Sequence, residues 1–230
     1  MSTGSSTRDG SRSGAPHRLV IVCAGVLVQV GLGSAYAWSV FRRPLSEEFG
    51  WSISMVTVTF SLFILTAGLA SVLGGVWMQR SGPRPVLVAS GILYGGGVAL
   101  ASKSADALWL LYGSYGVIAG AGLGLGYIVP IAVLQRWFPD RRGLINGIAV
   151  CGLPAGALLA APIAGWLIAR SGVLDAFLVL GVAYGVVIIG AGNAPARPTA
   201  IRRRFSATCG SHGARGRGCE AKRGRSARAA

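Results

Sequence analysis

The side chains in this chain that could do chemistry are polar groups set inside long apolar stretches. Eight of them could form hydrogen bonds to a bound molecule: Gln29, Tyr36, Trp38, Thr57, Thr59, Thr66, Tyr127 and Asn146. Hydroxyl, indole and amide groups can hold a polar ligand, but none of them is a strong acid or base near neutral pH. This set therefore favours ligand binding over catalysis.

The ionisable side chains lie away from these groups. All 22 basic residues fall outside the apolar stretches, the seven acids lie in tails, in loops or at the edge of a stretch, and His17 and His212 are terminal. General acid–base catalysis needs such groups placed together, so we expect no catalytic residue and no enzyme activity. Cys209, His212 and Cys219 resemble part of a zinc site without a fourth ligand, so we expect no metal and no cofactor.

The apolar stretches themselves are long enough to cross a bilayer as helices. Six of them run over residues 19–41, 54–78, 86–102, 109–135, 143–169 and 173–192. A hydrocarbon core about 30 Å thick needs about 20 residues of helix, and the short third stretch should extend into its flanks, Pro85 and Lys103. The composition, 52% hydrophobic and 13% charged, excludes a water-soluble enzyme. We predict an all-α polytopic membrane protein with six transmembrane helices.

The basic residues also predict an orientation. The N-terminal segment, the second and fourth loops and the C-terminal tail carry 18 Lys and Arg, whereas the other loops carry four, Arg42, Arg43, Lys103 and Arg170. Loops rich in Lys and Arg stay on the cytoplasmic side. We therefore expect a multi-pass protein of the cell membrane with both termini cytoplasmic.

The chain contains an internal repeat. Residues 31–36 (GLGSAY) recur as 122–127 (GLGLGY), 91 positions later, and the pattern G-x4-R-S-G of residues 75–82 recurs at 165–172, 90 positions later. Each match occupies the same place in a unit of three helices. Because three is odd, the second unit starts on the opposite membrane face, which predicts the 3+3 inverted repeat of many secondary transporters. Tyr36 and Tyr127 would then be equivalent.

The loop after the second apolar stretch carries a resemblance to a known family. The loop after the second stretch reads Gly75-Val-Trp-Met-Gln79-Arg80-Ser-Gly82-Pro83-Arg84. It resembles the G-x-x-x-D-R-x-G-R-[RK] motif of the major facilitator superfamily, with Gln79 in place of the Asp. From about residue 18 to 192 the chain is similar to the N-terminal six-helix half of that superfamily. The resemblance implies that this loop is part of a cytoplasmic gate, with its charge contact altered at Gln79.

The subgroup is indicated by three segments. They are Tyr36-Ala37-Trp38, Gly82-Pro83-Arg84 and the loop Arg136-Trp137-Phe138-Pro139-Asp140-Arg141-Arg142-Gly143, which resemble the oxalate/formate antiporters and their monocarboxylate-transporting relatives. This resemblance implies a small organic anion as substrate and alternating access between two bundles. It also implies that Tyr36 and Tyr127 bond the substrate. Trp38, Thr57 and Gln29 are further candidates, because they are polar side chains within the apolar stretches. The alternative is that these residues cap helix contacts or form an interfacial aromatic belt.

The last 35 residues differ in character from the rest. Residues 196–230 contain nine Arg and one acid, a composition that cannot bury a core. We therefore expect three regions: a disordered N-terminus (1–17), a six-helix bundle (18–195) and a disordered tail (196–230). The tail could bind anionic lipid or nucleic acid. We favour a frameshift or truncation and expect no nucleic-acid partner.

The function expected from the sequence is half of a secondary transporter. One bundle supplies one wall of a cavity, so the chain would be inactive alone or would pair with a second six-helix half, as a homodimer or with a separate chain. The alternative is a membrane anchor or assembly subunit that presents its basic tail to lipid or RNA.

Overall fold

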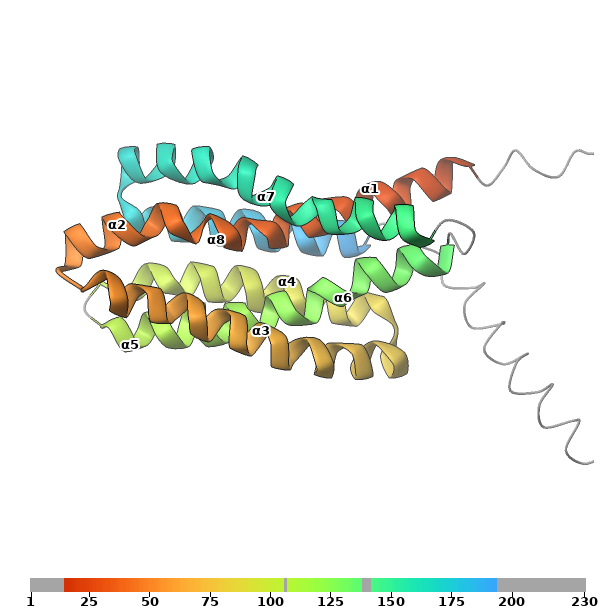
Figure 1. The fold of residues 1–230 in the computed structure, drawn as a ribbon, viewed down its shortest axis with the longest axis horizontal. Coiled ribbons are helices and arrows are strands. Elements are labelled where there is room, and N and C mark those ends of the chain that lie inside the picture. Colours follow the sequence, from red (N-terminus) through yellow and green to blue (C-terminus); the bar gives the residue numbers. More distant parts are fainter. Residues whose placement is uncertain (1–14, 106, 138–141, 194–230) are drawn as a thin grey trace, which may run out of the picture. The chain divides into compact units, whose positions relative to one another are not determined.

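The protein is a bundle of helices in the computed structural model, which describes residues 15–105, 107–137 and 142–193 (Figure 1). Its elements in chain order are α1 (Ala15–Gly33), η1 (Ser34–Ala37), α2 (Trp38–Phe49), α3 (Ile53–Ser81), α4 (Pro83–Leu100), η2 (Ala101–Lys103), α5 (Leu108–Leu111), η3 (Tyr112–Ala119), α6 (Gly120–Trp137), α7 (Arg142–Ser171) and α8 (Val173–Asn193). The described residues contain no strand. Of the N-terminal region predicted to be disordered, 1–17, residues 1–14 lie outside the described residues, whereas residues 15–17 begin α1. The predicted tail, 196–230, also lies outside the described residues.

These elements build six membrane spans. In order, spans 1 to 6 are Ile21–Phe49, Ile53–Ser81, Pro83–Lys103, Leu108–Gln135, Gly143–Ser171 and Val173–Asn193. The six apolar stretches found in the sequence are thus confirmed as six helices long enough to cross a membrane. The third span does extend into its flanks, from Pro83 to Lys103.

The first span is longer than its apolar stretch, and this corrects one prediction. Arg42 and Arg43, expected in a loop, lie inside α2, which continues to Phe49. The helix stops at Gly50, whose φ of 68° is left-handed. A left-handed residue, usually Gly, is a common helix end, and the sequence offers no such residue between Phe41 and Gly50. Because hydropathy reports where the bilayer ends and not where the helix ends, the pattern placed the boundary too early.

Two spans contain irregular helix, span 1 near its middle and span 4 in its first half. In span 1 the 3₁₀ segment η1 separates α1 from α2, and in span 4 the segment η3 is a π-helix. A π-helix changes the hydrogen-bonding register and leaves carbonyl groups for other partners. Here Thr66 of span 2 bonds the Gly116 carbonyl of η3, with Oγ1 2.7 Å from that oxygen. The same hydroxyl also lies 2.9 Å from the Leu62 carbonyl of its own helix.

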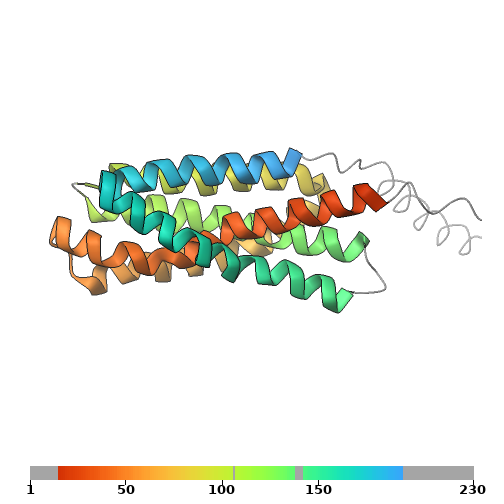
Figure 2. The same ribbon diagram turned by 90° about the horizontal axis from the view of Figure 1, so that it is seen from above.

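Three of the large helix contacts follow the predicted twofold relation between the repeats. They join α4 with α8, α3 with α6 and α1 with α7, and Figures 1 and 2 show the first of these pairs running side by side. Exchanging spans 1, 2 and 3 for spans 4, 5 and 6 converts the α3–α6 pair into the α7–α1 pair and leaves α4–α8 unchanged. Burial follows the same rule: within their most apolar windows spans 1 and 4 are both 56% buried, spans 2 and 5 are 28% and 33% buried, and spans 3 and 6 are 44% and 39% buried.

The repeated G-x4-R-S-G segments end their helices in the same way. Gly82 and Gly172, 90 residues apart, have φ values of 86° and 85°. Their N–H groups donate to Met78 and Ile168 respectively, each at 3.0 Å. A positive φ is easy only for glycine, so this residue ends span 2 and span 5 and allows the next helix to start at once. The internal repeat seen in the sequence is therefore a repeat of structure.

A third pair of matching segments lies where α4 crosses α8. Gly91-x2-Tyr94-Gly95 recurs as Gly181-x2-Tyr184-Gly185, again 90 residues later. A methyl group built on Gly95 would lie 2.7 Å from both the Gly181 carbonyl oxygen and the Gly185 Cα, and one on Gly185 would meet the Gly91 carbonyl oxygen at 3.4 Å. These are equivalent contacts viewed from the two repeats. The pseudo-twofold axis therefore passes through this crossing, where the absence of side chains lets the backbones touch.

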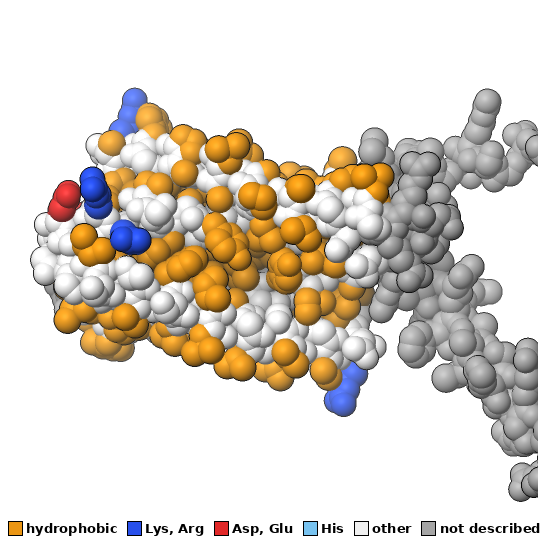
Figure 3. All heavy atoms as spheres, viewed as in Figure 1, with side chains coloured by type: hydrophobic (Ala, Val, Ile, Leu, Met, Phe, Trp, Pro, Cys, Tyr) orange, Lys and Arg blue, Asp and Glu red, His pale blue; other side chains and the backbone are white. Residues whose placement is uncertain are grey.

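The outer surface is that of a membrane protein. Large apolar side chains are exposed along the spans, among them Leu69, Leu73, Leu158 and Val186, each more than 60% exposed. Figure 3 shows hydrophobic side chains across the middle of this face, with Lys or Arg side chains at both ends and acidic side chains at one end. Bulk water would penalise such a surface, whereas lipid tails accept it.

Candidate functional site

Tyr36 is the predicted site residue that faces outward. It lies in η1, its side chain is 50% exposed, and its ring makes an edge-on contact with Phe60 of span 2, the two centroids being 6.3 Å apart. It is the sixteenth of the 29 residues of span 1. The hydroxyl is thus presented near the middle of the span on the outside of the bundle.

Tyr127 and Thr57 are placed differently. Tyr127 is half-buried in α6. The Thr57 hydroxyl donates to the Ile53 carbonyl of its own helix at 2.7 Å, so this threonine is satisfied locally. No described contact joins either residue to Tyr36, and the role of these residues in substrate binding stays a prediction.

Gln29 is fully buried between span 1 and span 5. Its side chain is 0% exposed, and neither amide atom has a hydrogen-bond partner among the described residues. A methyl group on Gly152 would lie 2.6 Å from the Gln29 Cβ, so the two helices are in close contact here. An unpaired amide in a dry interior costs about 1–3 kcal/mol. Thr59 of span 2 is also fully buried, with its hydroxyl unpaired within the described part of the chain.

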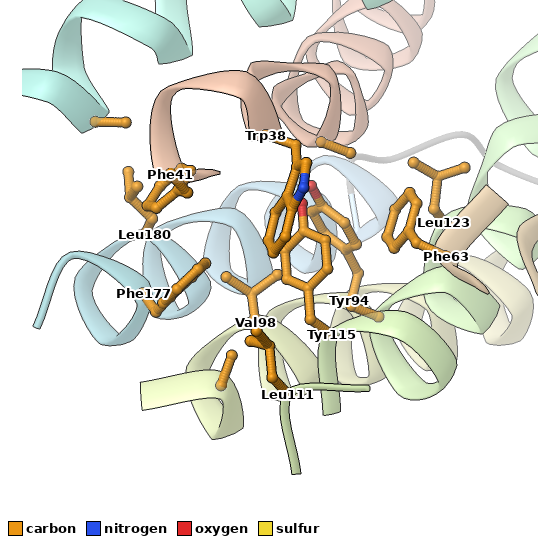
Figure 4. Packing of buried hydrophobic residues seen from close by; sticks show 14 of the residues in the cluster. Trp38, Phe41, Phe63, Tyr94, Val98, Leu111, Tyr115, Leu123, Phe177 and Leu180 are labelled. Carbon is orange, nitrogen blue, oxygen red and sulfur yellow. The ribbon is translucent and has the colours of Figure 1, made fainter. Parts of the chain in front are cut away.

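Trp38 belongs to the core of the bundle and not to its surface. Only 3% of its side chain is exposed, and its ring lies 4.4 Å from that of Tyr115 and 6.3 Å from that of Phe177. Figure 4 shows these aromatic side chains packed between spans 1, 4 and 6. The indole Nε1 has no hydrogen-bond partner among the described residues.

A cavity of about 10 Å³ lies beside this aromatic core. We call it the axial cavity, because Tyr94 and Tyr184, from the two helices that cross on the pseudo-twofold axis, both line it. Its walls are formed by Ser34, Ala37, Phe41, Tyr94, Val98, Tyr115, Ala164, Phe177, Leu180 and Tyr184. Ser34 Oγ lies 2.9 Å from the Tyr94 hydroxyl and 2.7 Å from the Gly31 carbonyl oxygen.

Sequence reasoning missed the hydroxyl groups of this cavity. The signal was present in the repeated G-x-x-Y-G pattern, which places Tyr94 and Tyr184 at equivalent positions. Their rings lie 6.0 Å apart. Nothing in the pattern reveals that Ser34 and Tyr115, from two other spans, meet them.

The predicted gating loop lies at one end of the bundle. Gln79 and Arg80 are exposed in the last turn of α3, and Arg84 is exposed in the first turn of α4. Gly75 has room for a side chain, since an added methyl group would meet only Ile128 at 3.9 Å. The motif glycine that the backbone requires is therefore Gly82.

The predicted loop between spans 4 and 5 is only partly described. Its residues are Arg136, Asp140, Arg141, Arg142 and Gly143, and residues 138–141 lie outside the described part of the chain. α6 ends at Trp137 and α7 begins at Arg142. The role of this loop stays a prediction.

Comparison with known proteins defines the class. The family model described as Major Facilitator Superfamily matches residues 23–207. The chain therefore belongs to the Major Facilitator Superfamily, a family of transporters, and its six helices form half of that fold.

Three known proteins are similar in sequence to most of this chain. The chain is 33% identical to the uncharacterized MFS-type transporter YhjX of Escherichia coli (strain K12), covering 76% of this chain and 43% of the relative. It is 31% identical to the oxalate:formate antiporter of Oxalobacter formigenes, covering 74% and 40%. It is 32% identical to monocarboxylate transporter 3 of Mus musculus, covering 71% and 33%. The chain thus spans less than half the length of these relatives.

Proposed function

We propose that this chain forms one half of a secondary transporter for small organic anions of the oxalate, formate or monocarboxylate class. The substrate class is suggested by two relatives, the oxalate:formate antiporter and monocarboxylate transporter 3. The bundle would work by alternating access against a second six-helix bundle, supplied by another copy or by a separate chain. Substrate would bind between the bundles, near the middle of the membrane.

The position of Tyr36 carries this proposal. A tyrosine hydroxyl in mid-membrane needs a polar partner, and lipid tails offer none. A water-filled cavity between two bundles supplies such a partner, and a substrate carboxylate would take its place. Tyr36 lies at the 3₁₀ break of span 1, where the helix departs from α-geometry and exposes this side chain.

The charge pattern supports the need for a second bundle. The six apolar stretches contain no Lys, Arg or His. A carboxylate buried without a positive partner is expensive in a medium of low dielectric constant. The cationic group would therefore come from the second bundle, while this one contributes hydrogen bonds.

We also propose that the end carrying Arg80 and Arg84 faces the cytoplasm. Figure 1 shows that α1 begins and α8 ends at the end where α3 is joined to α4. The positive-inside rule then places both termini in the cytoplasm. A reporter fused after residue 195 and found outside the cell would contradict this orientation.

The proposal is tested by anion exchange in liposomes. The full chain is reconstituted alone, and then with the second six-helix bundle of a related oxalate:formate antiporter, and uptake of labelled formate or oxalate is measured. We expect exchange only with the second bundle, reduced about tenfold by Tyr36→Phe through loss of one hydrogen bond to a charged group. The matched control is Tyr112→Phe, because the Tyr112 hydroxyl bonds the Met55 carbonyl at 2.9 Å.

Three outcomes would contradict this proposal or favour its alternative. Exchange that is equal for Tyr36→Phe and Tyr112→Phe contradicts the proposed site. Exchange by the monomeric chain contradicts the need for a second bundle. A phenotype that depends only on residues 196–230 favours the membrane-anchor alternative.

A further inference from the structure

Spans 2 and 5 carry equivalent stripes of exposed side chains. The span-5 stripe has exposed fractions of 56%, 53% and 55% before a final exposed arginine, and consists of Leu159, Ile163, Trp166 and Arg170. The span-2 stripe lies 90 positions earlier, with exposed fractions of 64%, 68% and 49% before its arginine, and consists of Leu69, Leu73, Val76 and Arg80. Neighbours in each stripe are three or four residues apart, so each stripe lies on one face of its helix.

The two stripes run toward opposite surfaces of the membrane. Figure 1 shows α3 and α7 ending at opposite ends of the bundle. In the same view, Figure 3 shows Lys or Arg side chains projecting at both ends. The inverted repeat therefore places one exposed arginine, at the end of an apolar stripe, in each leaflet.

The span-5 stripe extends from the middle of the membrane to its surface. Span 5 runs from Gly143 to Ser171, so Ala157 is its middle residue. At about 1.5 Å per residue, Trp166 lies about 14 Å and Arg170 about 20 Å from Ala157 along the helix. The hydrocarbon core extends about 15 Å from its centre. Trp166 is thus at the edge of the hydrocarbon, where tryptophan is enriched, and Arg170 is at the level of the lipid headgroups.

The Arg170 guanidinium is held in place by a ring but has no anionic partner. Its Cζ lies 4.4 Å from the centroid of the Trp166 ring, which is within the range of a cation–π contact. Asp175, the nearest acid along the chain, lies in the first turn of α8, and neither it nor any other described residue forms an ion pair or hydrogen bond with this guanidinium. The five N–H donors at the edge of the guanidinium plane are therefore available to an anion.

The equivalent end of span 2 is built differently. Val76 stands where span 5 has Trp166, and the neighbouring Trp77 forms no ring contact with Arg80 in the described part of the chain. Only the arginine of span 5 is thus fixed against an aromatic ring among the described residues of the two stripes. The repeat supplies the depth of the arginine, and the tryptophan is specific to the second unit.

We propose that Arg170 binds the phosphate of a phospholipid in the leaflet at its end of the bundle, with one acyl chain lying along Leu159, Ile163 and Trp166. The planar fork of a guanidinium matches two phosphate oxygens, and lipid chains accept the exposed apolar stripe. An anionic lipid such as phosphatidylglycerol is preferred over phosphatidylcholine, because its headgroup has no ammonium group that competes for the phosphate. With the orientation proposed above, this is the outer leaflet.

The test is native mass spectrometry of the full chain in detergent micelles titrated with phosphatidylglycerol. We expect Arg170→Gln to weaken binding of the first lipid about tenfold, through loss of charge-assisted hydrogen bonds. The matched control is Arg43→Gln, which removes the same charge from an exposed arginine of α2 that has no ring contact within the described residues. Equal losses in the two variants would overturn the proposal, because binding would then depend only on net charge.

A second pair of variants tests the part played by the ring. Trp166→Leu keeps an apolar side chain in the stripe and should weaken lipid binding about threefold, because the guanidinium is no longer held. Trp109→Leu is the control, since Trp109 is 71% exposed at the start of span 4. Equal affinities in these two variants would contradict the Trp166–Arg170 site.

Two competitors distinguish a lipid from other occupants. Sodium phosphate, compared with sodium chloride at equal ionic strength, should not displace the lipid, because free phosphate gains nothing from the apolar stripe. Displacement by phosphate alone would overturn the lipid as occupant and identify a site for free phosphate. The second six-helix bundle of a related oxalate:formate antiporter should also leave the lipid bound, and its release on addition of that bundle would make the stripe an interface between bundles.

Discussion

Tyr94 and Tyr184 stand at equivalent positions of the two repeats, and their rings lie 6.0 Å apart where α4 crosses α8. Each follows the same pattern, a glycine three residues before it and a glycine directly after it. The glycines bring the backbones into contact, and the tyrosines then meet beside the crossing. This pair of side chains thus reflects the twofold relation between the two repeats of the bundle.

The crossing itself gives the first prediction. Gly95→Ala should lower the free energy of unfolding by about 1–3 kcal/mol, because the new methyl group has no space between two backbones. The adjacent Gly96 has no atom within 4 Å of such a methyl group, so Gly96→Ala is the matched control and should be close to neutral. Denaturation in mixed micelles, followed by circular dichroism, measures both. Equal effects of the two substitutions would show that the helices do not cross here.

The helix ends give a second prediction, which tests the repeat. Gly82→Ala and Gly172→Ala should each cost about 1–3 kcal/mol, since both positions have a backbone conformation that other residues adopt only under strain. Because the two ends are equivalent, the two costs should be similar. Gly68→Ala is the control, a helical glycine with no atom within 4 Å of an added methyl group. A large cost at one end and none at the other would contradict the structural repeat.

Gln29 gives a third prediction, in which the substitution should stabilise the protein. Gln29→Met keeps the length of the side chain and removes an unpaired amide, so it should raise the free energy of unfolding by about 1–3 kcal/mol. Gln79→Met is the control, because Gln79 is exposed at the end of α3 and should be neutral. Thermal unfolding in detergent compares the two. A destabilised Gln29→Met would mean that the amide has a partner in the folded protein.

The π-helix of span 4 gives a fourth prediction. Thr66→Val removes the hydroxyl that bonds the Gly116 carbonyl across two helices, and should cost about 1 kcal/mol. Thr57→Val is the control, because within the described residues the Thr57 hydroxyl bonds only the Ile53 carbonyl of its own helix, at 2.7 Å. Unfolding in mixed micelles again reports the difference. If Thr57→Val lowered the free energy of unfolding more than Thr66→Val, the interhelical bond would contribute little.

The sequence by itself determined the spans and the symmetry. Hydropathy requires a bilayer to surround the apolar stretches, and a helix is the form in which a single segment satisfies its own backbone there. The common spacing of residues 75–82 and 165–172 then indicated the repeat, because the same backbone requirement recurs at Gly82 and Gly172. These are local properties, which can be predicted from the order of residues along the chain.

Only the tertiary structure decided which polar groups meet. Trp38 and Tyr36 are two residues apart, yet one is buried in the aromatic core and the other is half exposed. Residues two apart lie on opposite sides of a helix, but the periodicity of a span that is apolar all round does not tell which side faces the core. Ser34 and Tyr94 are 60 residues apart, and their hydrogen bond depends on how closely glycines allow the spans to pack. Such contacts arise from three-dimensional packing, and they cannot be predicted from the order of residues in one chain.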